Sequence, residues 1–191
     1  MELAFIQDQD YNNVDFSEEE LQTAEYENCT FTNCQFTGLN FSAFQFVACT
    51  FVECDFSMLQ LGFVRFQEVR FEQCRMMGLI FDHCKPILLS FEFINCLLDF
   101  SSFQQMSIPG TVFQNCSMQE VLFWQSNLSS SSFVDCNLAK ATFKECKLQK
   151  SDFRGAQLTE IDPTNNQIQQ AYFSMHSLPI LLKQYALNIE P

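Results

Sequence analysis

Residues 26–60 read YENCT FTNCQ FTGLN FSAFQ FVACT FVECD FSMLQ, and each group of five opens with a large aromatic residue, Tyr26 first and then Phe. A small or apolar residue comes two positions before each of these, and the remaining positions are mostly polar. An amphipathic helix repeats its apolar residues about every 3.6 positions, and a half-buried strand about every two. A period of five matches neither. It predicts short straight sides, each with two inward side chains and followed by a corner, that wind into one closed coil.

The period continues along the chain and divides into columns of like residues. One column recurs at 20 residues, apart from one step of 22, and its members are Phe31, Phe51, Phe71, Phe93, Phe113, Phe133, Phe153 and Phe173. A cysteine column has the same spacing and comprises Cys34, Cys54, Cys74, Cys96, Cys116 and Cys136. Like residues therefore recur at every fourth group, which predicts four sides per turn. The step of 22 predicts a two-residue insertion, a bulge or a small loop, within residues 85–90.

These patterns predict an all-β chain, a coiled solenoid whose stability comes from stacking, because one coil cannot bury its own apolar faces. Stacked Phe rings would supply most of the buried area. We expect three parts. Residues 1–13 form an N-terminal lead-in, residues 14–162 form the repeat solenoid with a register break near 85–92, and residues 163–191 form a last coil with a C-terminal helical cap.

The repeat weakens after Asp162 and Pro163, and the chain closes on HSLPILLKQYALNIEP. Ser177 followed by Pro179 predicts the start of a helix. We expect this short α-helix to cap the last coil. Its apolar surface exceeds what one coil end requires, so the module is also a candidate homodimer contact, since closed twofold dimers are the commonest oligomers. The candidate contacts are Leu178, Leu181, Leu182, Tyr185, Leu187 and Ile189.

Charge and composition narrow the classes of partner. The net charge is −13, from 23 acidic and 10 basic residues, which disfavours direct binding to nucleic acid or anionic membrane and suits a basic protein surface. No signal peptide is expected, and no apolar run approaches the ~18 residues of a membrane span. We therefore expect a cytoplasmic protein, whose ten cysteines are reduced thiols.

The cysteines and histidines, the residues most often used in catalysis and metal binding, do not predict an enzyme. All ten cysteines occupy inward small-residue positions, and close pairs such as Cys29 and Cys34 would lie on adjacent sides, which does not suit zinc. The histidines, His83 and His176, have no evident carboxylate partner by spacing. We therefore expect no catalytic, metal-binding or cofactor-binding residues and no cofactor. Four apolar residues are expected to point outward: Met58, Phe63, Met77 and Trp124. They are either scattered surface residues or a contact patch for a partner.

The A/C-x-F/L-x-x pattern of residues 14–162 resembles the pentapeptide-repeat family, which implies a right-handed quadrilateral parallel β-helix. The C-terminal module, residues 161–191, is similar to that of the Qnr, MfpA, McbG and AlbG group, with Asp162 and Pro163, a spaced coil and a Leu181 and Leu182 helix in common. That resemblance implies an end-to-end homodimer that mimics DNA and engages DNA gyrase or topoisomerase IV. It also implies resistance to quinolones or immunity to a gyrase-targeting toxin.

The resemblance points to an acidic partner face on the side of the Phe column. Its candidate residues are Glu53, Glu72, Glu92, Asp135 and Asp152. Arg70 and Arg154 dilute this face, residues 140–154 are locally basic, and the long projecting loops of Qnr proteins are missing. The alternative is a structural or protein-interaction solenoid with an unrelated protein partner.

Overall fold

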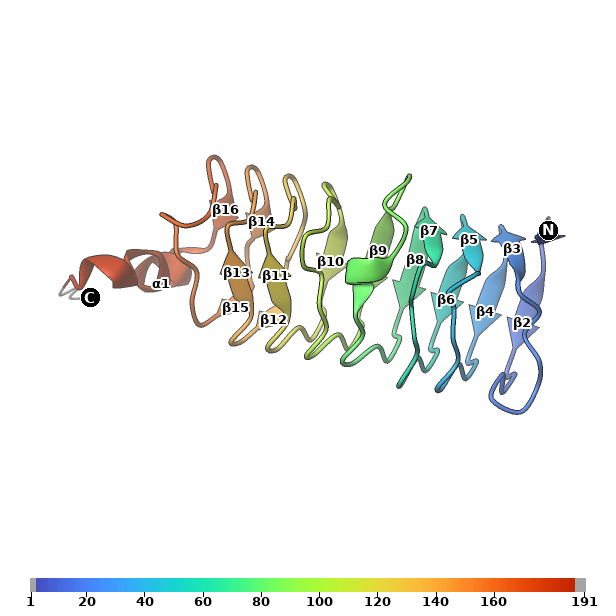
Figure 1. The fold of residues 1–191 in the computed structure, drawn as a ribbon. Coiled ribbons are helices and arrows are strands. Elements are labelled where there is room, and N and C mark those ends of the chain that lie inside the picture. Colours follow the sequence, from blue (N-terminus) through green and yellow to red (C-terminus); the bar gives the residue numbers. More distant parts are fainter. Residues whose placement is uncertain (1–2, 188–191) are drawn as a thin grey trace.

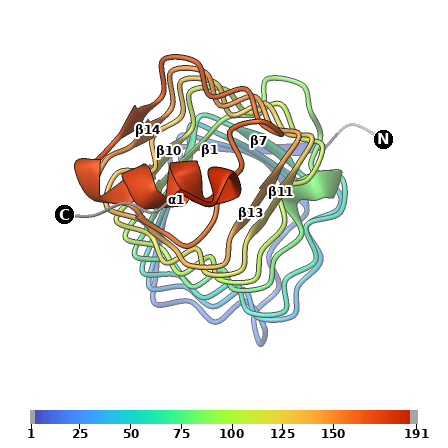
Figure 2. The ribbon, with the colours of Figure 1, turned by 90° about the vertical axis from the view of Figure 1, so that its left-hand side faces the viewer.

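A computed structural model describes residues 3–187, which form a parallel β-solenoid of about eight turns stacked as a rod (Figure 1). Viewed along the rod, successive coils superimpose on one four-sided outline (Figure 2). Residues 20 apart pair in parallel register, as Phe31 does with Phe51. The predicted all-β coil with four sides and a short C-terminal helix is confirmed.

Short strands lie on each side of the coil and pair with the strands one turn away. One sheet has the order β1 (Ala4–Gln7), β3 (Ala24–Glu27), β5 (Gln45–Val47) and β7 (Arg65–Gln67). The longest sheet contains β2 (Asp10–Asn12), β4 (Thr30–Thr32), β6 (Thr50–Val52), β8 (Val69–Glu72), β9 (Phe91–Ile94) and β10 (Val112–Gln114). The second half of the rod has the pairs β11 (Leu122–Trp124) with β13 (Thr142–Lys144), β12 (Asn137–Leu138) with β15 (Gln157–Leu158), and β14 (Asp152–Phe153) with β16 (Tyr172–Phe173).

The solenoid begins earlier than the repeat predicts, because β1 and β2 lie within residues 1–13. Ile6 pairs with Tyr26, and Tyr11 pairs with Phe31, in the same 20-residue register as the later coils. The exposed Gln9 stands at the small-residue position before Tyr11, and this interrupts the five-residue pattern. The first coil therefore belongs to the rod by its backbone, although its sequence does not continue the repeat.

The register changes once along the rod. β8 pairs with β9 at a step of 22, so that Phe71 lies opposite Phe93. The extra residues form a turn between the 3₁₀ helix η1 (Phe81–His83) and β9, with Leu88 in the left-handed conformation at φ 55°. Phe91 packs beside Phe66, with ring centroids 5.5 Å apart, and fills the core where the side is interrupted. The insertion therefore disturbs one side without opening the interior.

The Phe column forms a continuous stack through the core. Neighbouring rings from Phe31 to Phe173 lie nearly parallel, with centroids 4.8 to 5.2 Å apart. This distance is the spacing of hydrogen-bonded strands, so ring stacking and backbone pairing satisfy the same geometry. We name the outer side of this column the Phe face.

Where the second inward position holds cysteine or serine, the small side chain can also donate a hydrogen bond. Cys54 Sγ donates to the carbonyl of Phe31 at 3.3 Å, and Ser126 Oγ donates to that of Phe103 at 2.6 Å, each in the coil before. Burial raises the pKa of the Cys49 and Cys84 thiols to about 12, so these sulfurs stay protonated. Cysteine and serine at this position therefore play the same part, filling a small space and donating to a carbonyl of the coil before.

Candidate partner-binding surfaces

The five acidic residues predicted to form a partner face all lie on or beside the Phe face. Glu72, Glu92 and Asp152 lie on β8, β9 and β14, next to inward Phe residues, and they are half-buried. Glu53 and Asp135 stand at corners, in the left-handed conformation, and are exposed. Their surroundings differ, and this difference decides how much negative charge the face presents.

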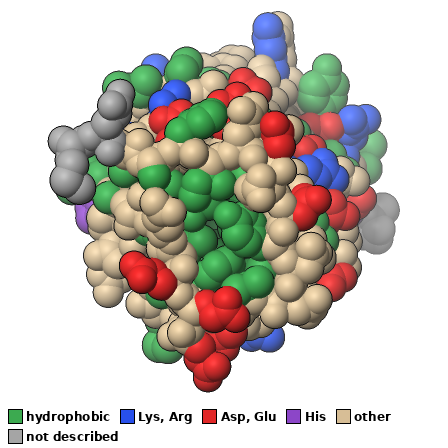
Figure 3. All heavy atoms as spheres, turned by 90° about the vertical axis from the view of Figure 1, so that its right-hand side faces the viewer, with side chains coloured by type: hydrophobic (Ala, Val, Ile, Leu, Met, Phe, Trp, Pro, Cys, Tyr) green, Lys and Arg blue, Asp and Glu red, His purple; other side chains and the backbone are tan. Residues whose placement is uncertain are grey.

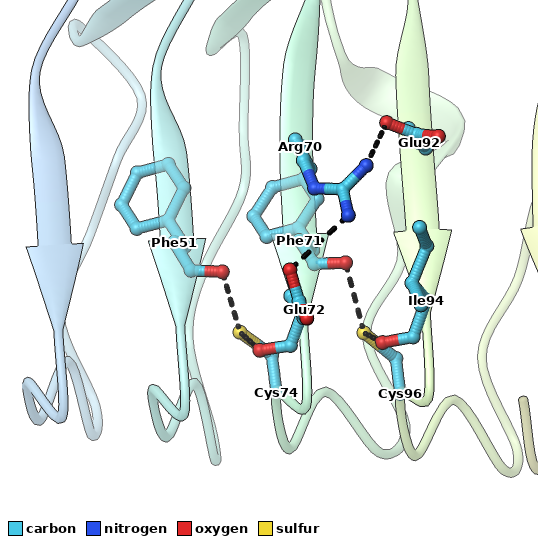
Figure 4. A network of polar contacts seen from close by, with 8 residues as sticks. All are labelled: Phe51, Arg70, Phe71, Glu72, Cys74, Glu92, Ile94 and Cys96. Carbon is cyan, nitrogen blue, oxygen red and sulfur yellow. Dashed lines mark hydrogen bonds and ion pairs between the residues drawn. The ribbon is translucent and has the colours of Figure 1, made fainter.

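Arg70 offsets half of the negative charge in the middle of the Phe face. It projects from β8 between two coils and contacts Glu92 (Nη1 to Oε2, 2.6 Å) and Glu72 (Nη2 to Oε2, 3.2 Å), as Figure 4 shows. One guanidinium thus bridges two carboxylates on neighbouring strands. A partner that seeks free carboxylates would have to break these ion pairs.

The C-terminal part of the same face carries a second pair. Arg154 Nε donates to Asp152 Oδ1 at 2.9 Å, and its guanidinium lies 5.5 Å from the centroid of the Tyr172 ring. The hydrogen bonds from Arg154 lower the pKa of the Asp152 carboxyl below its usual value. No ion pair involves Glu53 or Asp135 among residues 3–187, so these two remain the strongest acidic candidates on the Phe face.

The basic stretch 140–154 forms a belt and not a patch. These residues span most of one turn, so their side chains project from different sides of the same coil. Lys144 lies on β13, whereas Arg154 follows β14 on the Phe face, and Lys140 pairs with Glu120 at 3.1 Å. Each side of the rod therefore carries only some of these basic residues. Their closeness in the sequence suggests a more concentrated positive charge than the folded rod presents.

The densest group of acidic residues lies elsewhere, in the first coils. Residues 1–64 contain eleven acidic residues and neither Lys nor Arg. Most of them lie in the first turn and the start of the second, including Asp8, Asp10, Asp15 and Glu27. The site prediction did not include them, although the charge asymmetry along the sequence was the signal that could have identified them.

The C-terminal module begins with a coil that is held by a buried asparagine. Asn166 Oδ1 accepts a hydrogen bond from the Cys146 amide at 2.9 Å, and its Nδ2 donates to the Phe143 carbonyl at 2.9 Å. The 3₁₀ helix η2 (Met175–Ser177), α1 (Leu178–Leu182) and the 3₁₀ helix η3 (Lys183–Tyr185) follow. Ser177 precedes α1 as expected, but its buried hydroxyl makes no cap hydrogen bond.

The predicted dimer contacts divide between the core and the surface. Leu181 packs against the core together with Ile180, which the prediction omitted, and Leu182 is half-buried. Leu178, Tyr185 and Leu187 are exposed, whereas Ile189 lies outside the described residues. Tyr172 and Met175 extend the exposed apolar surface of this end.

Two of the four outward apolar residues, Met58 and Met77, line one open groove. Met58, Met77, Ile80 and His83 line a hollow of about 500 Å³, with Gly62 also in its wall. Phe63 is exposed next to Gly62, whereas Trp124 lies on β11, further along the rod. Asp82, the neighbour of His83, accepts hydrogen bonds from Ser102 Oγ at 2.8 Å and from the Gln104 amide at 2.8 Å.

The remaining titratable groups form no cluster suited to chemistry in the described part of the chain. The ten cysteines are free thiols and all are buried. Within residues 3–187, no group of three His, Cys, Asp or Glu side chains converges on a point where a metal ion would bind. Over the same residues, none of the helices is long and apolar enough to cross a membrane.

Comparison with known proteins agrees with this architecture. A family model described as pentapeptide repeat region matches residues 108–179. No curated protein matches the sequence. A trypsin-treated variant of QnrB1, a plasmid-mediated fluoroquinolone resistance protein, is 18% identical, with a TM-score of 0.62 over 98% of this chain and 92% of that one. Full-length QnrB1 is 16% identical, with a TM-score of 0.60 over 96% of this chain and 100% of that one.

At such identities the likeness concerns the fold. It extends along almost the whole of both chains, and it agrees with the column spacing and the parallel register of the coils. The family model thus identifies residues 108–179 as a pentapeptide repeat region, and the solved structures show the same solenoid fold along almost the whole chain.

Proposed function

We propose that this protein is a non-enzymatic binding protein of the cytoplasm, which engages a type II topoisomerase in place of DNA. The enzyme is DNA gyrase or topoisomerase IV, and the outcome is resistance to quinolones or immunity to a gyrase-targeting toxin. The carrying observation is an acidic rod of net charge −13 that has the fold of a fluoroquinolone resistance protein over nearly its full length. An enzyme surface that binds DNA is basic, and a negatively charged rod complements it.

A homodimer through the C-terminal module belongs to the same proposal. Leu178, Tyr185 and Leu187 expose apolar surface at that end, which a second copy would bury. Light scattering should give twice the 22.2 kDa mass of one chain. The Leu178→Asp variant should give the monomer mass, because it places a charge in the contact. A monomer mass for the unchanged protein would contradict the dimer.

Gyrase engagement is tested by supercoiling with and without a fluoroquinolone. Micromolar protein should inhibit supercoiling or reduce drug-stabilised DNA cleavage. Reversing charge at the two unpaired acids of the Phe face, Glu53→Lys with Asp135→Lys, should weaken the effect at least several-fold.

The matched control is Glu120→Lys with Glu145→Lys, which makes the same charge change at exposed corner positions away from the Phe face. Equal loss in both double variants would show that net charge acts and the face does not. Unchanged supercoiling and unchanged drug sensitivity at micromolar protein would contradict engagement of gyrase.

The second candidate function is an interaction solenoid with an unrelated protein partner. Its support is the partly neutralised middle of the Phe face, where Arg70 pairs with Glu72 and Glu92, together with the apolar groove beside Met58 and Met77. Loss of partner capture from cell extract by a Met58→Lys variant, with gyrase unaffected, would favour it.

A further inference from the structure

The N-terminal end of the rod exposes part of its core. Tyr26 and Phe31 of the second coil are fully buried, whereas their partners one coil earlier, Ile6 and Tyr11, are only half-buried. Figure 3 shows this end as a hollowed apolar centre. Ala4, Val14 and Leu21 complete the half-buried layer. The other end differs, because Ile180 and Leu181 of α1 pack against its last coil.

Backbone groups at the same end also lack strand partners. β1 pairs only with β3, and β2 only with β4, among the described residues. One coil further on, the Thr30 amide donates to the carbonyl of Gln9 at 2.9 Å, and the Thr32 carbonyl accepts from the Asn13 amide at 2.9 Å. The equivalent groups of β2 are the Asp10 amide and the Asn12 carbonyl. They form an open edge to which another strand can hydrogen-bond.

An acidic rim surrounds this open end. Figure 3 shows carboxylates around the apolar centre, and Asp8, Asp10, Asp15, Glu18, Glu19 and Glu20 all lie in the first coil. No Lys or Arg occurs before Arg65, so nothing in these coils neutralises them. Like charges on two such ends would repel, which opposes a second copy joining end to end here. The rim complements lysine or arginine.

We propose that the N-terminal end binds a basic protein segment in extended conformation, which adds to β2 as a further strand. In such a strand the side chains alternate between the two faces. An apolar side chain would cover Tyr11, as Phe31 does from the other side at 4.7 Å between ring centroids. The flanking Lys or Arg side chains would lie beside Asp10 and the other rim carboxylates. The open edge of β2, the half-buried apolar layer and the acidic rim thus all favour the same ligand, an extended basic segment with alternating apolar residues.

This surface is separate from the one proposed to engage gyrase. It lies at the opposite end from the C-terminal module and does not use Glu53 or Asp135. Loss of binding at the N-terminal end would leave the supercoiling result unchanged, and a failed supercoiling assay would leave this binding unchanged. The two proposals therefore fail independently.

The test uses the full chain and a labelled peptide of alternating Lys and Val. Fluorescence anisotropy should show binding that weakens as salt rises, because exposed charges are screened. Asp10→Asn with Glu18→Gln should weaken binding about 2- to 30-fold, if each exposed pair contributes as such pairs usually do. The control Glu68→Gln with Glu145→Gln makes the same change of net charge far from residues 4–20 and should leave the affinity unchanged.

Two further measurements identify the site. Hydrogen exchange should slow at residues 4–16 when the peptide binds, because the edge amides gain partners. An N-methylated peptide, which lacks donors on one edge, should bind more weakly. Equal affinity for a Glu-Val peptide, slowed exchange elsewhere on the rod, or no binding at low salt would overturn the proposal. Concentration-dependent protection of residues 4–16 without peptide would assign this end to self-association and would also overturn it.

Discussion

Replacing Phe51 by alanine tests whether the stacked column holds the rod together. The Phe51 ring is fully buried, and it stacks on Phe31 at 4.8 Å and on Phe71 at 5.2 Å between centroids. Removing a buried Phe costs about 3–5 kcal/mol in other proteins, because contacts are lost and a cavity remains. At roughly 2–4 °C per kcal/mol for a chain of this size, the melting temperature should fall by about 6–20 °C.

The control is the exposed Phe63, 69% of which is accessible to solvent. Phe63→Ala should change the free energy of unfolding by no more than about 0.5 kcal/mol. Phe51→Leu keeps an apolar side chain but loses both stacked ring pairs, each worth about 0.5–1.5 kcal/mol, so it should fall between the other two variants.

The assay should resolve the effect along the rod. Repeat arrays can unfold in parts, so hydrogen exchange is measured together with thermal denaturation. Phe51→Ala should speed exchange in the coils around residues 31–71 and leave the coil of Phe133 protected. Similar losses for Phe51→Ala and Phe63→Ala, or uniform exchange along the rod, would refute the reasoning.

Three further changes test the coils near the C-terminus. Asn166→Ala leaves two buried backbone groups without hydrogen-bond partners, which should lower the free energy of unfolding by about 1–3 kcal/mol for each group. Thermal denaturation should show this loss for Asn166→Ala and no such loss when an exposed Asn is replaced by alanine. The pKa of Asp152 is lowered in the folded protein, so its ionised carboxylate stabilises the fold. This contribution is complete above the ordinary pKa of about 3.9 and is lost as the pH falls through the lower pKa of the folded state. An NMR titration should show this low midpoint, and Arg154→Gln should raise it; an unchanged midpoint would contradict the pairing. Gly155→Ala should destabilise more than Gly38→Ala in urea unfolding: both have positive φ, but only the first places a Cβ against a neighbouring carboxylate.

The sequence predicted the architecture well because each inward position requires the same kind of buried side chain in every coil. A column that holds only Phe at a spacing of 20 follows from in-register stacking, and the structure places Phe113 directly opposite Phe93. The cysteines were correctly assigned to packing. Their hydrogen bonds to carbonyls of the coil before were not predicted, because such a bond joins residues that only the closed coil brings together.

The partner surface was harder to predict. Outward positions follow no periodic pattern of residue types. Whether an outward charge forms an ion pair therefore depends on which side chain lies beside it in the next coil. Arg70 meets Glu92 across 22 positions, and this distance depends on the insertion between β8 and β9. The five proposed acids were therefore placed on one side, but the ion pairs that three of them form with Arg70 and Arg154 were not predicted.

The sequence by itself determined the period, the four sides and the core, since a repeated apolar position has only one way to be buried in a stacked coil. The tertiary structure decided which charges remain unpaired and where the core ends. It turned the basic stretch 140–154 into a belt, because 15 residues nearly encircle the rod. It also exposed the layer of Ile6 and Tyr11 at the N-terminal end. Burial there depends on whether something stacks on the outer side of the first coil, and no local pattern in the chain contains that information.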